Sequence, residues 1–179
     1  LEPGRGLTDA IDNPGRIDGL FIERAMIKAN ERLSILSAEA PISSPILTDG
    51  SAFFQLQEEF SAAFETSVVD LPRSMLIAYP HLLQAVNVVV VVCEFSLASA
   101  RDAIRLLAWL KSNTPQCQTV VVANKVQAGS MEISRKDFES SIERKIELLI
   151  PFDPKATAQS AKLGKPVVDA MRTSKVSTG

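Results

Sequence analysis

The chain has 179 residues, a length that suits one domain with its own hydrophobic core. Apolar residues make up 46% of it and charged residues 22%, a balance that excludes an intrinsically disordered polypeptide. The formal net charge of −2 gives no bulk electrostatic reason to expect a nucleic acid as partner. The sequence therefore predicts a folded domain whose binding class has to come from local motifs.

The two cysteines and the single histidine do not form a metal-binding pattern. Cys93 and Cys117 lie in or beside runs that we predict as buried strands, and we interpret them as thiols in a reducing cytoplasm. His81 follows a proline on a predicted helix, and we interpret it as a structural or surface residue. No apolar run reaches the roughly 18 residues that a membrane helix needs. We therefore expect a cytoplasmic protein without direct membrane insertion.

Residues 1–19 are rich in glycine, proline and aspartate, and we predict leading helices and a loop at residues 1–31. One short helix is expected at residues 8–11 with Thr8 as its cap, and a second is expected to start close to Asp18. Polar and apolar residues alternate at 32–38, which indicates a strand.

The next two expected elements are a loop and an amphipathic helix. Residues 40–50 contain two prolines and a glycine, which is typical of a loop. Residues 51–64 place four phenylalanines close to helical spacing, which predicts a helix packed on a sheet. We interpret this aromatic stripe as core rather than as a ligand site.

From residue 66 onward, runs of β-branched residues alternate with helical patterns. The runs are continuously apolar, which is typical of strands covered on both faces, so we predict an α/β fold. Its sheet should be mostly parallel, with helices on both faces. The expected strands are 66–70, 87–94, 117–126 and 145–151, and the expected helices are 74–85, 97–113, 134–143 and 154–164.

Ligands of open α/β sheets bind outside the carboxyl ends of the strands. The residues that the predicted strands deliver there are Asp70, Glu94, Asn124, Pro151, Phe152 and Asp153. Each polar residue also has a structural interpretation, which stays open. Asp70 could cap a turn, Asn124 could be a turn amide, and Asp153 before a proline could cap a helix.

The stretch from Asn124 to Gln127 invites comparison with the N-K-x-D motif of guanine-binding GTPases. Gln127 stands in the place of the aspartate, and an amide offers no charged acceptor to guanine's N–H groups. A purine bound here is therefore not expected to be guanine. The chain contains no G-x-x-x-x-G-K-[ST] phosphate loop.

The order of motifs resembles that of the CpaE/TadZ pilus-assembly proteins. These are divergent members of the MinD/ParA family of deviant P-loop ATPases, which belong to the SIMIBI class. The resemblance spans nearly the whole chain. Its motifs are VVDLPRS, VVVVVCEFSLASARDAIRLL, VVVANKV and an ending of the form IPFDPK…A…GKP.

The resemblance implies roles for particular residues. Asp70 is similar to the switch aspartate on the Mg²⁺ and γ-phosphate side, where it would meet the metal indirectly through water. Asn124 is similar to the residue that reads the adenine edge, and Pro151, Phe152 and Asp153 are similar to the loop beside the base. Glu94 and Ser96 fall where the family's nucleotide-dependent dimer face often lies.

The resemblance also implies a phosphate loop on a first strand and an acid pair on the next, and the 179 residues contain neither. We expect the chain to begin downstream of that missing N-terminal strand. Residues 1–179 would then be a partial ATPase domain, with its α/β core at 32–170 and a frayed tail at 171–179. ATP and Mg²⁺ are expected as cofactors of the parent protein. The chain alone is predicted to bind them poorly, to lack hydrolysis, and to expose a sheet edge.

The implied function is a Tad/Flp pilus assembly and polar localisation factor. Its expected partners are a second copy and the pilus assembly and secretion machinery, which would bring it to a cell pole or the inner-membrane face. One alternative is a non-catalytic dimerisation scaffold with a degenerate nucleotide site. Another is a ParA-like partitioning ATPase, which would need a basic patch. The late basic residues are interspersed with acids, which disfavours nucleic-acid binding.

Overall fold

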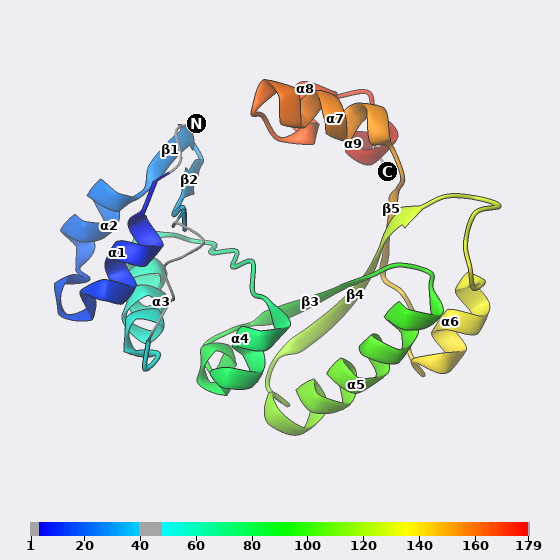
Figure 1. Cartoon of the computed structure of the whole chain (residues 1–179), viewed down its shortest axis with the longest axis horizontal. Helices are drawn as coiled ribbons and strands as arrows, with labels where there is room; N and C mark the ends of the chain where they lie inside the picture. The colour runs from blue at the N-terminus through cyan, green and yellow to red at the C-terminus, as the bar shows by residue number, and fades with distance from the viewer. Residues whose placement is uncertain (1–3, 40–47, 179) are drawn as a thin grey trace. The chain divides into compact units, whose positions relative to one another are not determined.

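The computed structural model describes residues 4–39 and 48–178 (Figure 1). The chain divides into two compact units, Leu1–Ala85 (unit 1) and Val86–Gly179 (unit 2), each of which is described by itself. Most of the predicted loop at 40–50 falls outside the described residues.

The helices of unit 1 that pack together around α3 (Ser51–Ala63) are α1 (Gly6–Asp12), the 3-10 helix η1 (Pro14–Arg16) and α2 (Gly19–Ala25). The buried side chains of Ala10, Ile22 and Leu56 form its core, with Phe60 and Phe64 packed against them. The predicted helix at 51–64 is confirmed. Its expected packing on a sheet is wrong, because α3 contacts α1, η1 and α2.

The starts of α1 and α2 differ in how their backbone N–H groups are satisfied. α2 starts close to Asp18 as predicted, and Asp18 is its cap, since its carboxylate accepts the N–H of Phe21 at 2.7 Å. Thr8 does not cap α1, which begins two residues earlier, and its hydroxyl donates to the carbonyl of Arg5. The N–H of Leu7 donates to the Ser37 carbonyl at 3.0 Å, so a backbone partner satisfies one of the N–H groups of this helix start.

A short antiparallel hairpin joins β1 (Ile27–Asn30) to β2 (Leu33–Ile35). The strand predicted at 32–38 is thus confirmed in part, whereas β1 was not predicted. The side chain of Asn30 accepts the N–H of Arg32 at 2.8 Å, which closes the turn.

The strand predicted at 66–70 is wrong. These residues have no regular secondary structure, and the side chains of Val68 and Val69 are 92% and 66% exposed. A strand exists only where a neighbour accepts and donates its backbone hydrogen bonds, so β-branched residues alone cannot form one. The following predicted helix is divided at Pro80 into α4 (Arg73–Ala78) and η2 (Pro80–Leu83).

Unit 2 contains a parallel three-stranded sheet, in which β3 (Val88–Cys93), β4 (Gln118–Val126) and β5 (Leu148–Pro151) lie side by side in chain order (Figure 1). The connecting helices are α5 (Leu97–Asn113) and α6 (Arg135–Ser141). The predicted α/β class and parallel sheet are confirmed.

The two faces of this sheet differ in their cover. One face packs with α5 and α6 in a core whose most buried members include Val121, Ala123 and Phe138. The rings of Phe95 and Phe138 meet edge to face there, with centroids 5.5 Å apart. On the other face of β3, alternate valines are 45%, 54% and 60% exposed, namely Val88, Val90 and Val92. Within the described part of the chain, β3 and β5 are the two outer strands of the sheet.

The chain ends in three helices: α7 (Pro154–Leu163), α8 (Val167–Ala170) and α9 (Lys175–Thr178). The predicted helix at 154–164 is confirmed, and it ends at Gly164 in the left-handed backbone region. The stretch that we expected to be a frayed tail contains α9, next to the buried Ser174. None of the described helices is long and apolar enough to cross a membrane.

Candidate functional site at the carboxyl ends of the strands

The carboxyl ends of β3, β4 and β5 lie at one edge of the sheet. Cys93 pairs with Ala123, and Val126 pairs with Pro151. Just beyond the last pair, the N–H of Phe152 donates to the carbonyl of Val126 at 3.0 Å. The parallel order therefore brings the tips of the three strands together, as the sequence predicted for the segments that carry Glu94, Asn124 and Phe152.

The tip of β4 carries an irregularity in its pairing with β5. Three residue steps on β4, from Ala123 to Val126, match two on β5, from Leu149 to Pro151. The extra residue is a β-bulge, a feature that re-aims side chains and is common beside active sites. Asn124 and Lys125 lie within it, and the amide oxygen of Asn124 accepts the N–H of Lys125 at 2.8 Å.

An ion pair connects the tips of β3 and β4. The ammonium of Lys125 lies 2.6 Å from a carboxylate oxygen of Glu94, and both side chains are about half exposed, at 56% and 52%. The N–H of Glu94 also donates to the hydroxyl of Ser99 at 3.0 Å. Sequence reasoning placed Glu94 and Lys125 at this edge but did not pair them, because the contact spans 31 residues of chain.

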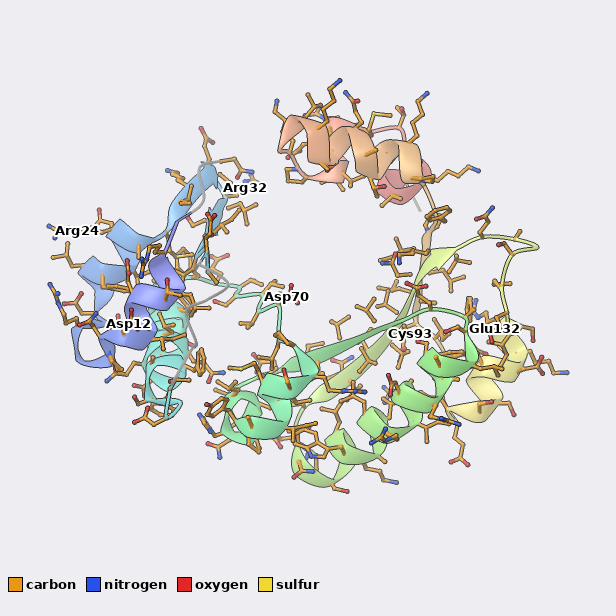
Figure 2. All side chains as sticks on the ribbon, viewed as in Figure 1. Asp12, Arg24, Arg32, Asp70, Cys93 and Glu132 are labelled. Atoms are coloured by element: carbon orange, nitrogen blue, oxygen red, sulfur yellow. The ribbon has the colours of Figure 1, made fainter. Side chains whose placement is uncertain are left out.

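The loop after β4 folds back onto the start of α5. The carboxylate of Glu132 accepts the N–H of Leu97 at 3.2 Å, and the N–H of Ile133 donates to the Phe95 carbonyl. Ser96 caps the same helix, since its hydroxyl accepts the N–H of Ser99. Figure 2 labels Glu132 on this loop and Cys93 at the end of β3. Sequence reasoning missed Glu132, for which an isolated glutamate gives no signal.

The segment after β5 contributes Pro151, Phe152 and Asp153. Phe152 is 44% exposed, so its ring is accessible to a planar ligand. Asp153 caps α7, because its carboxylate accepts the N–H of Ala156 at 2.9 Å. The structural interpretation of Asp153 is therefore confirmed, and its part in base binding stays a prediction.

Cys93 is a neutral thiol at the end of β3. Its sulfur donates to the carbonyl of Val122 at 3.3 Å, and burial raises the pKa of the thiol. A thiol held in this way is a poor nucleophile. The edge is therefore not built for thiol chemistry.

Asp70 belongs to unit 1 and lies on the exposed, extended chain that leads to α4 (Figure 2). The strand expected to carry it is not formed, and Asp70 belongs to a different unit from the edge made by β3, β4 and β5. Its role as a switch aspartate stays a prediction.

The residues at this edge are better suited to binding a base than to binding phosphates. An amide and an exposed aromatic ring can recognise a planar heterocycle. Among the residues that the structure describes, there is no group of three or more His, Cys, Asp or Glu side chains that could hold a metal ion. The sequence has no phosphate-loop motif either. These residues thus do not fit a complete Mg-ATP site, and no phosphoryl-transfer step is assigned to them.

Comparison with solved structures identifies this architecture. A ParA family ATPase from Chlorobium tepidum TLS superposes with a TM-score of 0.86 at 21% identity, covering 99% of this chain and 73% of that one. The fold is that of the ParA and MinD ATPases. MinD from Aquifex aeolicus gives a TM-score of 0.68 at 20% identity, with 99% of this chain and 70% of the other covered.

The MinD protein from Pyrococcus horikoshii OT3, which was solved in complex with Mg-ADP, gives a TM-score of 0.75 at 14% identity. The superposition covers 99% of this chain and 70% of the Pyrococcus protein. No protein-family model and no curated protein matches the sequence. At these identities, the likeness to ParA and MinD concerns the fold.

Proposed function

We propose that this chain is the base-reading part of a MinD/ParA-like ATPase domain that acts as a Tad/Flp pilus assembly and polar localisation factor. The observation that carries the proposal is that Asn124 and Phe152 lie at the tips of neighbouring strands, at the carboxyl edge of a parallel sheet with the ParA/MinD fold. This is where open α/β sheets bind their ligands.

Adenine is the base that this edge suits best. The half-buried amide of Asn124 can donate to a ring nitrogen and accept from an exocyclic amine, and the exposed ring of Phe152 offers a stacking surface. Gln127 lacks the carboxylate that would favour guanine. In this proposal, Asp70 acts on the side of Mg²⁺ and the γ-phosphate.

The pilus role is supported by the sequence motifs, above all DLPRS and IPFDPK…A…GKP. In this proposal, the protein acts as a homodimer and is brought to a cell pole or to the inner-membrane face by the pilus assembly and secretion machinery. Loss of the gene product is expected to disperse that machinery from the pole, which fluorescence microscopy of a labelled pilus component would measure.

The second candidate is a dimerisation scaffold that does not turn over nucleotide. This candidate rests on the lack of a phosphate-loop motif in the 179 residues. A scaffold would keep the fold and the partners but would bind ATP and GTP equally poorly.

Calorimetric titration with Mg-ATP and Mg-GTP separates the two candidates. The titrations use this chain and the full-length gene product, with Asn124→Ala as the site variant. Asn113→Ala is the matched control, because the amide of Asn113 donates to its own helix at the Trp109 carbonyl. An ATPase predicts ATP-selective binding by the full-length product, weakened about tenfold or more by Asn124→Ala alone. Absence of binding by the full-length product would leave only the scaffold.

A further inference from the structure

Lys125 is held in an unusual backbone conformation. Among the described residues other than glycine, only Lys125 and Glu143 have a positive φ, of 54° and 53°. Glu143 follows Ile142, the C-cap of α6, and a left-handed residue is common at that position. Lys125 instead lies near the end of a strand, where such a conformation is unfavourable for a side chain with a Cβ atom. Strain of this kind is typical of functional sites.

This conformation affects the side chain of Asn124. The N–H of Lys125 points at the side-chain amide of Asn124, at 2.8 Å. A backbone N–H can be accepted only by the oxygen of that amide and not by its NH₂ group. The hydrogen bond therefore fixes the positions of the oxygen and the NH₂ group of the Asn124 amide, and a 180° flip of the amide would break it.

Amide orientation decides between the two purines. Adenine presents an acceptor at N1 and a donor at N6, whereas guanine presents a donor at N1 and an acceptor at O6. An asparagine pairs with either base edge if its amide is free to flip. An amide whose orientation is fixed keeps its NH₂ group in one position and suits only one of the two patterns.

The ion pair between Lys125 and Glu94 explains how the conformation is maintained. At 2.6 Å and about half exposed, it adds little to global stability. Its two partners come from neighbouring strands, however, and the pair restrains the left-handed residue from the side-chain end. We propose that Lys125, restrained by Glu94, is a positioning residue that fixes the orientation of the Asn124 amide and so sets the preference for adenine over guanine.

This inference rests on the proposed function, because a purine must bind for Asn124 to select it. Its test uses glycine as the discriminating substitution. Glycine adopts a positive φ without strain, so Lys125→Gly should keep the residue-125 N–H directed at Asn124 even though the ion pair is gone. Lys125→Ala, which also lacks the ion pair, should lose this N–H direction. Lys125→Arg keeps both the charge and the pair.

The first measurement is NMR on this chain. The three-bond coupling of the residue-125 amide proton reports φ, and the side-chain signals of Asn124 report its hydrogen bond. Both are expected to change in Lys125→Ala and Glu94→Ala. Both should be retained in Lys125→Arg, Lys125→Gly and the double variant Glu94→Ala/Lys125→Gly. Asp9→Asn is the matched control, since it breaks an exposed ion pair to Arg5 in unit 1.

The second measurement is the ratio of ATP to GTP affinity in the full-length gene product. Lys125→Ala and Glu94→Ala are expected to lower that ratio about tenfold, the size of one directional hydrogen-bond contact to a base. Lys125→Gly should restore it. The inference is overturned if the NMR signals of Asn124 do not respond, or if the ratio stays constant while wild type binds ATP. Failure of wild type to bind any nucleotide would instead overturn the proposed function.

Discussion

Glu139 and Ile146 are seven residues apart in sequence, and the buried carboxylate of Glu139 accepts the backbone N–H of Ile146 at 3.1 Å. The same carboxylate accepts from Lys145 and from Arg135, each at 2.9 Å. Arg135 also donates to the Ile146 carbonyl. One acid thus fastens the end of α6 to the chain that leads into β5.

Replacing Glu139 by glutamine should destabilise unit 2. The amide cannot accept all three donors, and it leaves the charges of Arg135 and Lys145 without their shared counter-ion. We expect a lower midpoint of urea unfolding for Glu139→Gln, read by circular dichroism. Glu58→Gln, at an exposed position of α3, should leave the midpoint unchanged. Equal midpoints for both variants would show that the network does not contribute to stability.

The stability of the chain should also depend on pH through Glu139. Its hydrogen bonds to Lys145, Ile146 and Arg135 lower the pKa of this carboxyl from an ordinary 4.5 to about 2. Since the folded state holds the proton less tightly, the contribution is complete above about pH 4.5 and is lost as the pH falls toward about 2.

The measurement is a series of urea unfolding curves from about pH 6 down to about pH 3. The gap in unfolding free energy between wild type and Glu139→Gln should narrow as the solution is acidified below pH 4.5. A gap that widens with acid would contradict the sign of the pKa shift.

Phe138 and Phe54 should differ sharply in their response to truncation. Phe138 is completely buried against Phe95, whereas Phe54 is 49% exposed on α3. Phe138→Ala should therefore cost about 3–5 kcal/mol of unfolding free energy, and Phe54→Ala about 0.5 kcal/mol. Chemical denaturation of both variants tests this difference. Similar losses of unfolding free energy would contradict the role of Phe138 in the core of unit 2.

The exposed valines of β3 should promote self-association. Val92 is 60% exposed on an edge strand, and Val92→Lys puts a charge on that surface at a stability cost of about 0.5 kcal/mol. Sedimentation velocity should show less self-association for this variant than for wild type. Val91→Lys, at a position only 5% exposed, should instead unfold the sheet. If Val92→Lys folds but self-associates as strongly as wild type, the exposed valines of β3 do not cause the association.

The sequence predicted those parts of the fold that depend on local composition. The continuous β-branched runs of β3 and β4, the helix start near Asp18 and the helix cap Asp153 all depend on a few neighbouring residues. The segment 66–70 has the same composition as a strand but lacks a neighbour to bond with, so composition misled the prediction there.

Some features of the candidate site could likewise be predicted from the sequence, and others could not. The parallel order of the strands was enough to bring the tips that carry Glu94 and Asn124 together. The pairing of Glu94 with Lys125 spans 31 residues, and the positive φ of Lys125 falls within the bulge, so neither has a signature in the linear sequence. The contact of Glu132 with the start of α5 was missed for the same reason.

The chain order of the sheet in unit 2 also bears on how the protein is made. Because β3, β4 and β5 are neighbours in the order of synthesis, β4 and β5 each leave the ribosome when the strand they pair with has already been made. The sheet can therefore grow one strand at a time, with only one helix-length loop to close at each step. The growing sheet always exposes its newest strand until the next one pairs with it, which gives chaperones a defined surface during translation.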